Sequence, residues 1–140
     1  MTKDEELSKY LALIEQYKEQ INSLDVQFSY VQAAVQDYVK AKITVEELSK
    51  ADDGNEVLIP IGGSTYVTAT AKNTSKLLFD IGAGVVTEKT CEDTVKMLDK
   101  RIEKLQQTQE KIASMVQQLQ AEAAEISEKA QKILSEGSKQ

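Results

Sequence analysis

Two glycine pairs are the residues in this sequence whose types and spacing come closest to a known chemistry. They are Gly62 with Gly63, and Gly82 with Gly84. A glycine-rich loop can hold a phosphate when it follows a strand and opens a helix, because the helix N-terminus then meets the anion. Here a strand-like run both precedes and follows each pair, and no Gly-Lys-Ser/Thr element is present. The pairs therefore predict tight turns and no nucleotide site.

Two other side chains that could do chemistry lack the partners that the chemistry needs. Cys91 is the only cysteine, and the sequence has no histidine that could activate its thiol. Asp80 stands among apolar residues without a paired acid or base, so a proton transfer has no second group. We expect Cys91 to be a small, buried apolar group and Asp80 to be a strand residue that faces solvent. The chain is accordingly predicted to have no catalytic residues and not to be an enzyme.

Two groups of carboxylates are candidates for binding a cation. They are Asp4, Glu5 and Glu6 near the start of the chain and Glu122, Glu125 and Glu128 near its end. Charge runs on helices usually face solvent, and the histidines and paired cysteines that hold zinc or copper are missing. We therefore expect no metal and no cofactor.

Composition excludes further classes of function. The 140 residues include 23 acidic and 17 basic ones, a net charge of −6, so no basic surface is available to neutralise nucleic-acid phosphates. The first ten residues, MTKDEELSKY, lack the apolar run of a signal peptide, and no stretch approaches the roughly 18 apolar residues of a membrane span. We expect a soluble, cytoplasmic protein without nucleic-acid or membrane partners.

Two long helices are the first elements that the sequence predicts. Apolar residues recur at alternating spacings of three and four over residues 7–45 and again over residues 95–133, and only Lys42 and Gln109 interrupt them. A 3-4 repeat of this length is typical of a supercoiled helix. Because the chain must reverse between the two stretches, we predict an antiparallel coiled coil formed by residues 1–50 and 91–140.

Two Thr-x-x-Glu motifs bear on where the first helix begins and ends. Thr2 with Glu5 has the pattern of a capping box that starts a helix. Thr44 with Glu47 has the same pattern, so we expect an interruption of the first helix around Ile43.

The segment between the helices, residues 51–90, has a different composition. Charge falls, β-branched residues increase, and the runs EVLIPI, TYVTATA, LLFDI and VVTEK predict four short strands. The glycine pairs join them into two β-hairpins, and a turn at Asp52–Asn55 leads out of the first helix. The predicted fold class is thus α+β, with a long antiparallel helical hairpin and two β-hairpins between its helices.

Isolated β-hairpins are marginally stable because their edges and one face stay uncovered. We therefore expect the strands to pair with other subunits and to contribute to an intersubunit β-barrel. The apolar strand residues that would form this assembly surface are Val57, Ile59, Ile61, Tyr66, Val67, Leu77, Phe79, Ile81, Val85 and Val86.

The outer ends of the two helices offer more apolar surface than one partner helix covers. Two uses of this surface are open: further helix packing within an oligomer, or contact with other proteins. The residues concerned are Leu7, Tyr10, Leu11, Leu13, Ile14, Ile126, Ile133 and Leu134.

This order of helix, two hairpins and helix resembles the alpha-type subunits of prefoldin, the class of archaeal prefoldin alpha and of its eukaryotic counterpart, subunit 5. EVLIPIGGSTYVTATA is similar to the first hairpin of that family. The segment from Leu77 through FDIGAGVVTEKT is similar to the second hairpin, and it runs directly into a helix in which Lys100-Arg101-Ile102 take the position of the family's coil. Beta-type subunits have one hairpin, so the second hairpin favours the alpha type.

The resemblance implies a hexamer of two alpha and four beta subunits, with a double β-barrel body and coiled-coil arms. It implies an ATP-independent chaperone, or holdase, whose arm tips capture unfolded proteins and pass them to a group II chaperonin. From their position, we assign client binding to the eight residues named at the helix ends. Acidic residues such as Glu122, Glu125 and Glu128 could meet a basic chaperonin surface. The alternative is a structural, prefoldin-like subunit that polymerises into filaments through the same strands.

Overall fold

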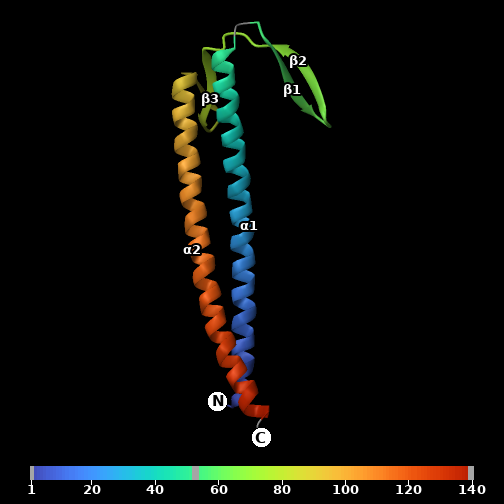
Figure 1. Ribbon diagram of the computed structural model, residues 1–140, viewed down its shortest axis with the longest axis vertical. Coiled ribbons are helices and arrows are strands. Elements are labelled where there is room, and N and C mark those ends of the chain that lie inside the picture. Colours follow the sequence, from blue (N-terminus) through green and yellow to red (C-terminus); the bar gives the residue numbers. More distant parts are fainter. Residues whose placement is uncertain (1, 52–53, 139–140) are drawn as a thin grey trace. The chain divides into compact units, whose positions relative to one another are not determined.

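The computed structural model describes residues 2–51 and 54–138, so Asp52 and Asp53 of the predicted turn lie outside the described residues. Its elements follow the predicted order of helix, two hairpins and helix (Figure 1). They are α1 (Lys3–Lys50), β1 (Glu56–Gly62), β2 (Thr65–Thr70), β3 (Lys76–Gly82), β4 (Val85–Thr90) and α2 (Cys91–Ser138). The predicted α+β fold class is confirmed.

The chain divides into two compact units, and each long helix contributes to both. Unit 1 consists of Met1–Ala34 and Leu105–Gln140, and unit 2 consists of Val35–Lys104. Unit 1 is therefore a pair of helical segments, whereas unit 2 holds both hairpins together with the helical segments that flank them.

In unit 1 the segments of α1 and α2 lie side by side and run in opposite directions (Figure 1). Leu24, Ile112 and Ala130, which belong to the predicted 3-4 repeats, are buried. Leu7 near the start of α1 and Ile133 near the end of α2 line the same hollow, as antiparallel pairing requires. The apolar spacing therefore predicts the buried side of both helices in this unit.

The two Thr-x-x-Glu motifs have different outcomes. At the start of α1, the Glu5 amide donates to Thr2 Oγ1 over 3.2 Å and the Thr2 amide donates to Glu5 Oε2 over 3.3 Å, which is a reciprocal capping box. The predicted interruption around Ile43 is wrong, because α1 continues to Lys50. The Thr44 hydroxyl donates to the Lys40 carbonyl oxygen over 2.9 Å and is satisfied within the helix.

The core of unit 2 joins both helices to the second hairpin. Val45 from α1, Phe79 from β3 and Leu98 from α2 form one buried cluster. Leu77 and Cys91 pack against the cluster and are partly buried, so β3 is held against the helices through one face.

The two hairpins have the same construction. Each is a two-stranded antiparallel sheet, β1 with β2 and β3 with β4. The register is irregular between Pro60 and Gly62 and again between Asp80 and Gly82, which leaves Ile61 as an extra residue in the first hairpin. The pairings of Gly62 with Thr65 and of Gly82 with Val85 leave two-residue loops, which are Gly63-Ser64 and Ala83-Gly84. Both residues of each loop have positive φ, as in type I′ turns.

Candidate interaction surfaces

The first hairpin exposes apolar side chains on both of its faces. On one face Ile59 and Val67 are paired across the strands and exposed. On the other face Leu58 is 66% exposed, and Tyr66 is 58% exposed. Val57 is half-buried and Ile61 is exposed. Apolar surface on two faces, with unpaired strand edges, is suited to pairing with another chain.

The second hairpin divides its apolar residues between the core of unit 2 and the outside. Phe79, predicted to contact other subunits, is buried in the core and fixes β3 against the helices. Leu77 is half-buried beside it. The exposed apolar residues of this hairpin are Leu78, Ile81, Val85 and Val86.

Arg101 connects the second hairpin to both helices, and the sequence indicated no such role for it. Its guanidinium carbon lies 4.6 Å from the centre of the Phe79 ring and 5.8 Å from that of Tyr38, distances at which cation-π attraction operates. The same guanidinium donates to the Asp80 carbonyl oxygen over 3.3 Å and to the Tyr38 hydroxyl over 3.4 Å. Arginine on α2 thereby positions β3 against α1.

Asp80 and Cys91 have structural contacts. The Asp80 side chain is exposed, and its carboxylate accepts a hydrogen bond of 2.8 Å from the Gly82 amide, which shapes the turn. Cys91 is a free thiol at the start of α2, half-buried, and it donates to the Thr74 carbonyl oxygen over 3.1 Å. These contacts give both residues a structural role.

The two polar residues that interrupt the apolar repeats each have a polar partner on the opposite helix. Lys42 Nζ lies 2.9 Å from Asp99 Oδ1 in unit 2, and this hydrogen bond and the carboxylate charge raise the pKa of Lys42. Gln109 donates its amide to the side-chain oxygen of Gln32 in unit 1. These pairs favour one alignment of the helices over slipped ones, because a shift would separate them.

We call the end of unit 1 where α1 begins and α2 ends the terminal end. A hollow of about 400 Å³ there has both apolar and polar walls, and Lys3 in its wall forms a salt bridge of 3.3 Å with Glu136. The lining residues are Thr2, Lys3, Asp4, Leu7, Ile133, Leu134 and Gly137. Of the eight residues predicted at the helix ends, Leu11 and Leu134 are exposed. The other six are half-buried: Leu7, Tyr10, Leu13, Ile14, Ile126 and Ile133.

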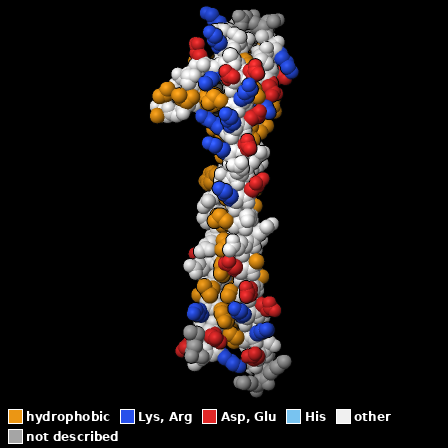
Figure 2. All heavy atoms as spheres, turned by 90° about the vertical axis from the view of Figure 1, so that its left-hand side faces the viewer, with side chains coloured by type: hydrophobic (Ala, Val, Ile, Leu, Met, Phe, Trp, Pro, Cys, Tyr) orange, Lys and Arg blue, Asp and Glu red, His pale blue; other side chains and the backbone are white. Residues whose placement is uncertain are grey.

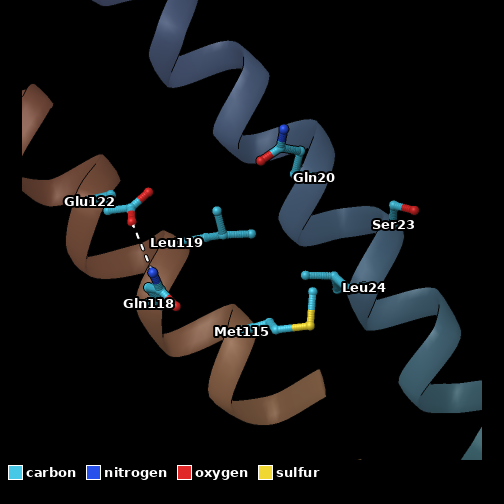
Figure 3. A pocket seen from close by; sticks show the side chains of 7 residues that line it. All are labelled: Gln20, Ser23, Leu24, Met115, Gln118, Leu119 and Glu122. Carbon is cyan, nitrogen blue, oxygen red and sulfur yellow. Dashed lines mark hydrogen bonds between the residues drawn. The ribbon is translucent and has the colours of Figure 1, made fainter. Parts of the chain in front are cut away.

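The sequence did not predict a second hollow of unit 1. This groove of about 420 Å³ is lined by Gln20, Ser23 and Leu24 from α1 and by Met115, Gln118, Leu119 and Glu122 from α2 (Figure 3). The apolar side chains of Leu24, Met115 and Leu119 point into the space between the helices (Figure 3). Met115 lies one residue before Val116 of the 3-4 repeat, and this flanking position was the available signal.

Charge and apolar surface are distributed unevenly over the described part of the chain. Hydrophobic side chains gather in the hairpin region of unit 2 and form an interrupted row on the visible face of unit 1, with charged groups of both signs beside them (Figure 2). Within residues 2–51 and 54–138 no group of three or more acidic or thiol side chains could hold a metal ion. No helix among those residues is long and apolar enough to cross a membrane.

The chain thus consists of two long helices with two β-hairpins between them in sequence, and both hairpins carry exposed apolar side chains. The family model described as prefoldin subunit matches residues 17–136. The chain belongs to the prefoldin family, which supports a role as a chaperone subunit and is not a family of enzymes.

Relatives of this chain within the family include alpha subunits. The chain is 29% identical to prefoldin subunit alpha of Archaeoglobus fulgidus, an alignment that covers 90% of this chain and 92% of the relative. It is 33% identical to prefoldin subunit alpha of Methanosarcina mazei, with 87% of this chain and 93% of the relative covered. The resemblance to the alpha type is thus confirmed.

Two solved structures share the fold. A chain of filamentous prefoldin from Methanocaldococcus jannaschii matches with a TM-score of 0.53 and 21% identity over 90% of this chain and 98% of that chain. The prefoldin beta subunit from Thermococcus strain KS-1 matches with a TM-score of 0.59 and 17% identity over 90% of each chain. At these identities the likeness concerns the fold alone.

Proposed function

We propose that this chain is the alpha-type subunit of an ATP-independent holdase that captures unfolded proteins at the terminal end of unit 1. The observation that carries the proposal is the exposed apolar surface there, where Leu11 and Leu134 lie uncovered and a hollow with Leu7 and Ile133 adjoins Leu134. An unfolded protein exposes apolar side chains of many shapes, and exposed apolar side chains such as Leu11 and Leu134 can contact them. Capture of this kind needs no bond cleavage and therefore no nucleotide.

We infer that the hairpins join this chain to beta-type subunits in a hexamer of two alpha and four beta chains. Support comes from the two exposed apolar faces of the first hairpin and from the exposed residues of the second. Each hairpin is a two-stranded sheet, and strands added at its edges would pair its free backbone groups. The assembly residues in this proposal are the ten predicted from the sequence, among which Phe79 acts indirectly by positioning β3.

Release and delivery form the next part of the proposal. The affinities of several weak contacts combine, because binding at one arm raises the effective concentration of the client at the other arms. One arm can therefore dissociate from the client while the others still bind it. Transfer to a group II chaperonin would then exploit charge, because Glu125 and Glu128 are exposed and could meet a basic surface. We place the complex in the cytoplasm, where the free thiol of Cys91 is kept reduced.

A filament is the second candidate assembly, and the exposed strand edges of both hairpins favour it as much as they favour the hexamer. The likeness to a chain of filamentous prefoldin adds a common fold to this alternative. Light scattering separates the two: a closed hexamer that forms only with a beta-type partner supports the chaperone, whereas long polymers of this chain alone support the filament.

Replacing Leu11 and Leu134 together by glutamine is expected to weaken client holding without disturbing assembly. Both side chains are exposed, so their loss removes apolar contact area for a client while leaving the buried repeat intact. Because the beta-type arms keep their own contacts, the complex concentration that halves client aggregation should rise roughly threefold to tenfold. Light scattering of a chemically unfolded client, mixed with the assembled complex, measures this.

The matched control is Val26→Gln with Tyr30→Gln, which changes two exposed apolar residues of α1 in the same unit but away from its terminal end. It should leave holding unchanged. Full activity of the Leu11 and Leu134 variant, in a complex of unchanged mass, would refute client binding at the terminal end.

A further inference from the structure

We propose that the groove around Met115 is a second client contact, which binds an extended segment carrying two apolar residues with a basic residue between them. The inference rests on the proposed holding function and extends it from the terminal end along unit 1. The occupant is a stretch of unfolded polypeptide, and four features of the groove favour it: its apolar floor, its continuity with the terminal end, its charge and its polar rim.

The first feature is an accessible apolar floor. Met115 is 50% exposed although its side chain points toward Leu24 on the opposite helix (Figure 3). Methionine is unbranched and polarizable, so it adapts its shape to different apolar partners. A half-exposed methionine facing leucines suits a surface that must accept many side chains.

The second feature is continuity with the residues assigned to clients. Leu13, one of the eight at the helix ends, lines a smaller hollow together with Gln16, Tyr17 and Gln20. Gln20 also lines the groove of Met115, so the two hollows adjoin. From Leu13 to Leu24 a helix rises about 16 Å, which an extended chain covers in about five residues.

The third feature is the charge between the two hollows. All residues that line the groove are among those the structure describes, and Glu122 is the one charged residue among them. Tyr17 lines the adjoining hollow, and burial together with a hydrogen bond to Glu122 and the charge of that carboxylate raises the pKa of the Tyr17 hydroxyl. The carboxylate also accepts from the Gln118 amide over 3.3 Å and still has lone pairs free for a cation. A lysine or arginine in the bound segment would complete this site.

The polar rim fits a polypeptide backbone. Gln20, Ser23 and Gln118 border the apolar floor and carry amide and hydroxyl groups that can both donate and accept hydrogen bonds. Such groups can meet backbone N–H and C=O groups whatever the client sequence is. In an extended segment, residues at alternate positions point the same way, so an apolar, a basic and an apolar residue spaced two apart would face the groove together.

The test uses the full chain assembled with a beta-type partner and three fluorescein-labelled peptides in a Gly/Ser background. The first contains Leu-Ser-Lys-Ser-Leu, the second replaces its Lys with Glu, and the third replaces both Leu with Ser. Fluorescence anisotropy should show the Lys peptide binding about threefold or more tightly than the Glu peptide, and the Ser peptide binding most weakly. Equal affinity for all three would overturn the proposal.

Variants of the groove decide where the peptide binds. Met115→Gln should weaken the Lys peptide roughly threefold to tenfold, whereas Val26→Gln, at a residue of similar exposure, 55%, outside the groove, should not. Glu122→Gln should remove the preference for Lys over Glu. Equal effects of the Met115 and Val26 variants on peptide affinity would overturn the proposal. A change in the mass of the complex caused by Met115→Gln would also overturn it, because the groove would then be a contact with another subunit.

The Leu11 and Leu134 variant separates this proposal from the proposed function. If that variant and the Met115 variant both weaken client holding, both stand. If only the Leu11 and Leu134 variant does, the groove proposal fails and holding at the terminal end survives. If neither does, the proposed function itself fails.

Discussion

Replacing Gly82 and Gly84 together by valine is expected to abolish stable assembly with a beta-type partner. Gly82 has a φ of +123° and Gly84 a φ of +76°, in a region where a β-branched side chain is strained. Each substitution costs on the order of 1–3 kcal/mol, which a two-residue loop cannot relieve while keeping its register. The second hairpin would then lose its shape, and the strands of the partner subunits would have no ordered strand edge to pair with.

Light scattering of a mixture that holds two beta-type chains for each copy of this chain, the ratio of the proposed hexamer, measures the result. The wild-type chain should give a closed complex, and the double variant should give separate subunits with helix content retained in circular dichroism. Gly137→Val is the matched control, because Gly137 lies in α2 without a positive φ and a Cβ there meets open space. A complex of full mass from the double variant would show that this turn does not govern assembly.

The second large effect is expected on stability, from Leu98→Ala. Leu98 is 4% exposed and packs with Val45 and Phe79 in the buried cluster of unit 2. Truncating a buried leucine removes its apolar contacts and leaves a cavity, which typically costs about 2–5 kcal/mol. Urea unfolding of the isolated chain, followed by circular dichroism, should show a fall of this size in the free energy of unfolding.

Leu78→Ala is the matched control for this measurement. Leu78 lies in β3 next to Phe79 but is 74% exposed, so its truncation should change stability by less than about 0.5 kcal/mol in the isolated chain. If Leu98→Ala costs no more than Leu78→Ala, the cluster of Val45, Phe79 and Leu98 does not hold the second hairpin to the helices.

The regular parts of the fold could be predicted from the sequence because they depend on local spacing. The 3-4 repeats identify the buried residues of α1 and α2, such as Leu24 and Ile112, since helical geometry places them on one side. The strands and the tight turns between them follow from β-branched runs around glycines, and the Thr2 capping box follows from a four-residue motif. Each of these signals lies within a few residues of the feature it specifies.

The remaining features depend on contacts between segments distant in sequence. Thr44 has the pattern of a cap, but packing of Val45 in the core of unit 2 continues the helix through it. Phe79 follows the strand alternation of its neighbours, but its burial results from packing against Val45 of α1 and Leu98 of α2. Arg101 of α2 also lies over its ring. Predicting the groove at Met115 requires knowing which residues of α1 lie opposite it, and a pattern within one segment does not contain this information.

An aggregation assay of an unfolded client with the assembled complex and without nucleotide is the direct test of the proposed holdase function. A chemically denatured client is diluted into buffer containing the chain and its beta-type partner, with no nucleotide present, and aggregation is followed by light scattering. We predict that suppression saturates at about one complex per client molecule, as expected when several arms hold one chain together, and that added ATP changes nothing. Undiminished aggregation at an excess of intact complex, or suppression that requires ATP, would contradict the proposed function.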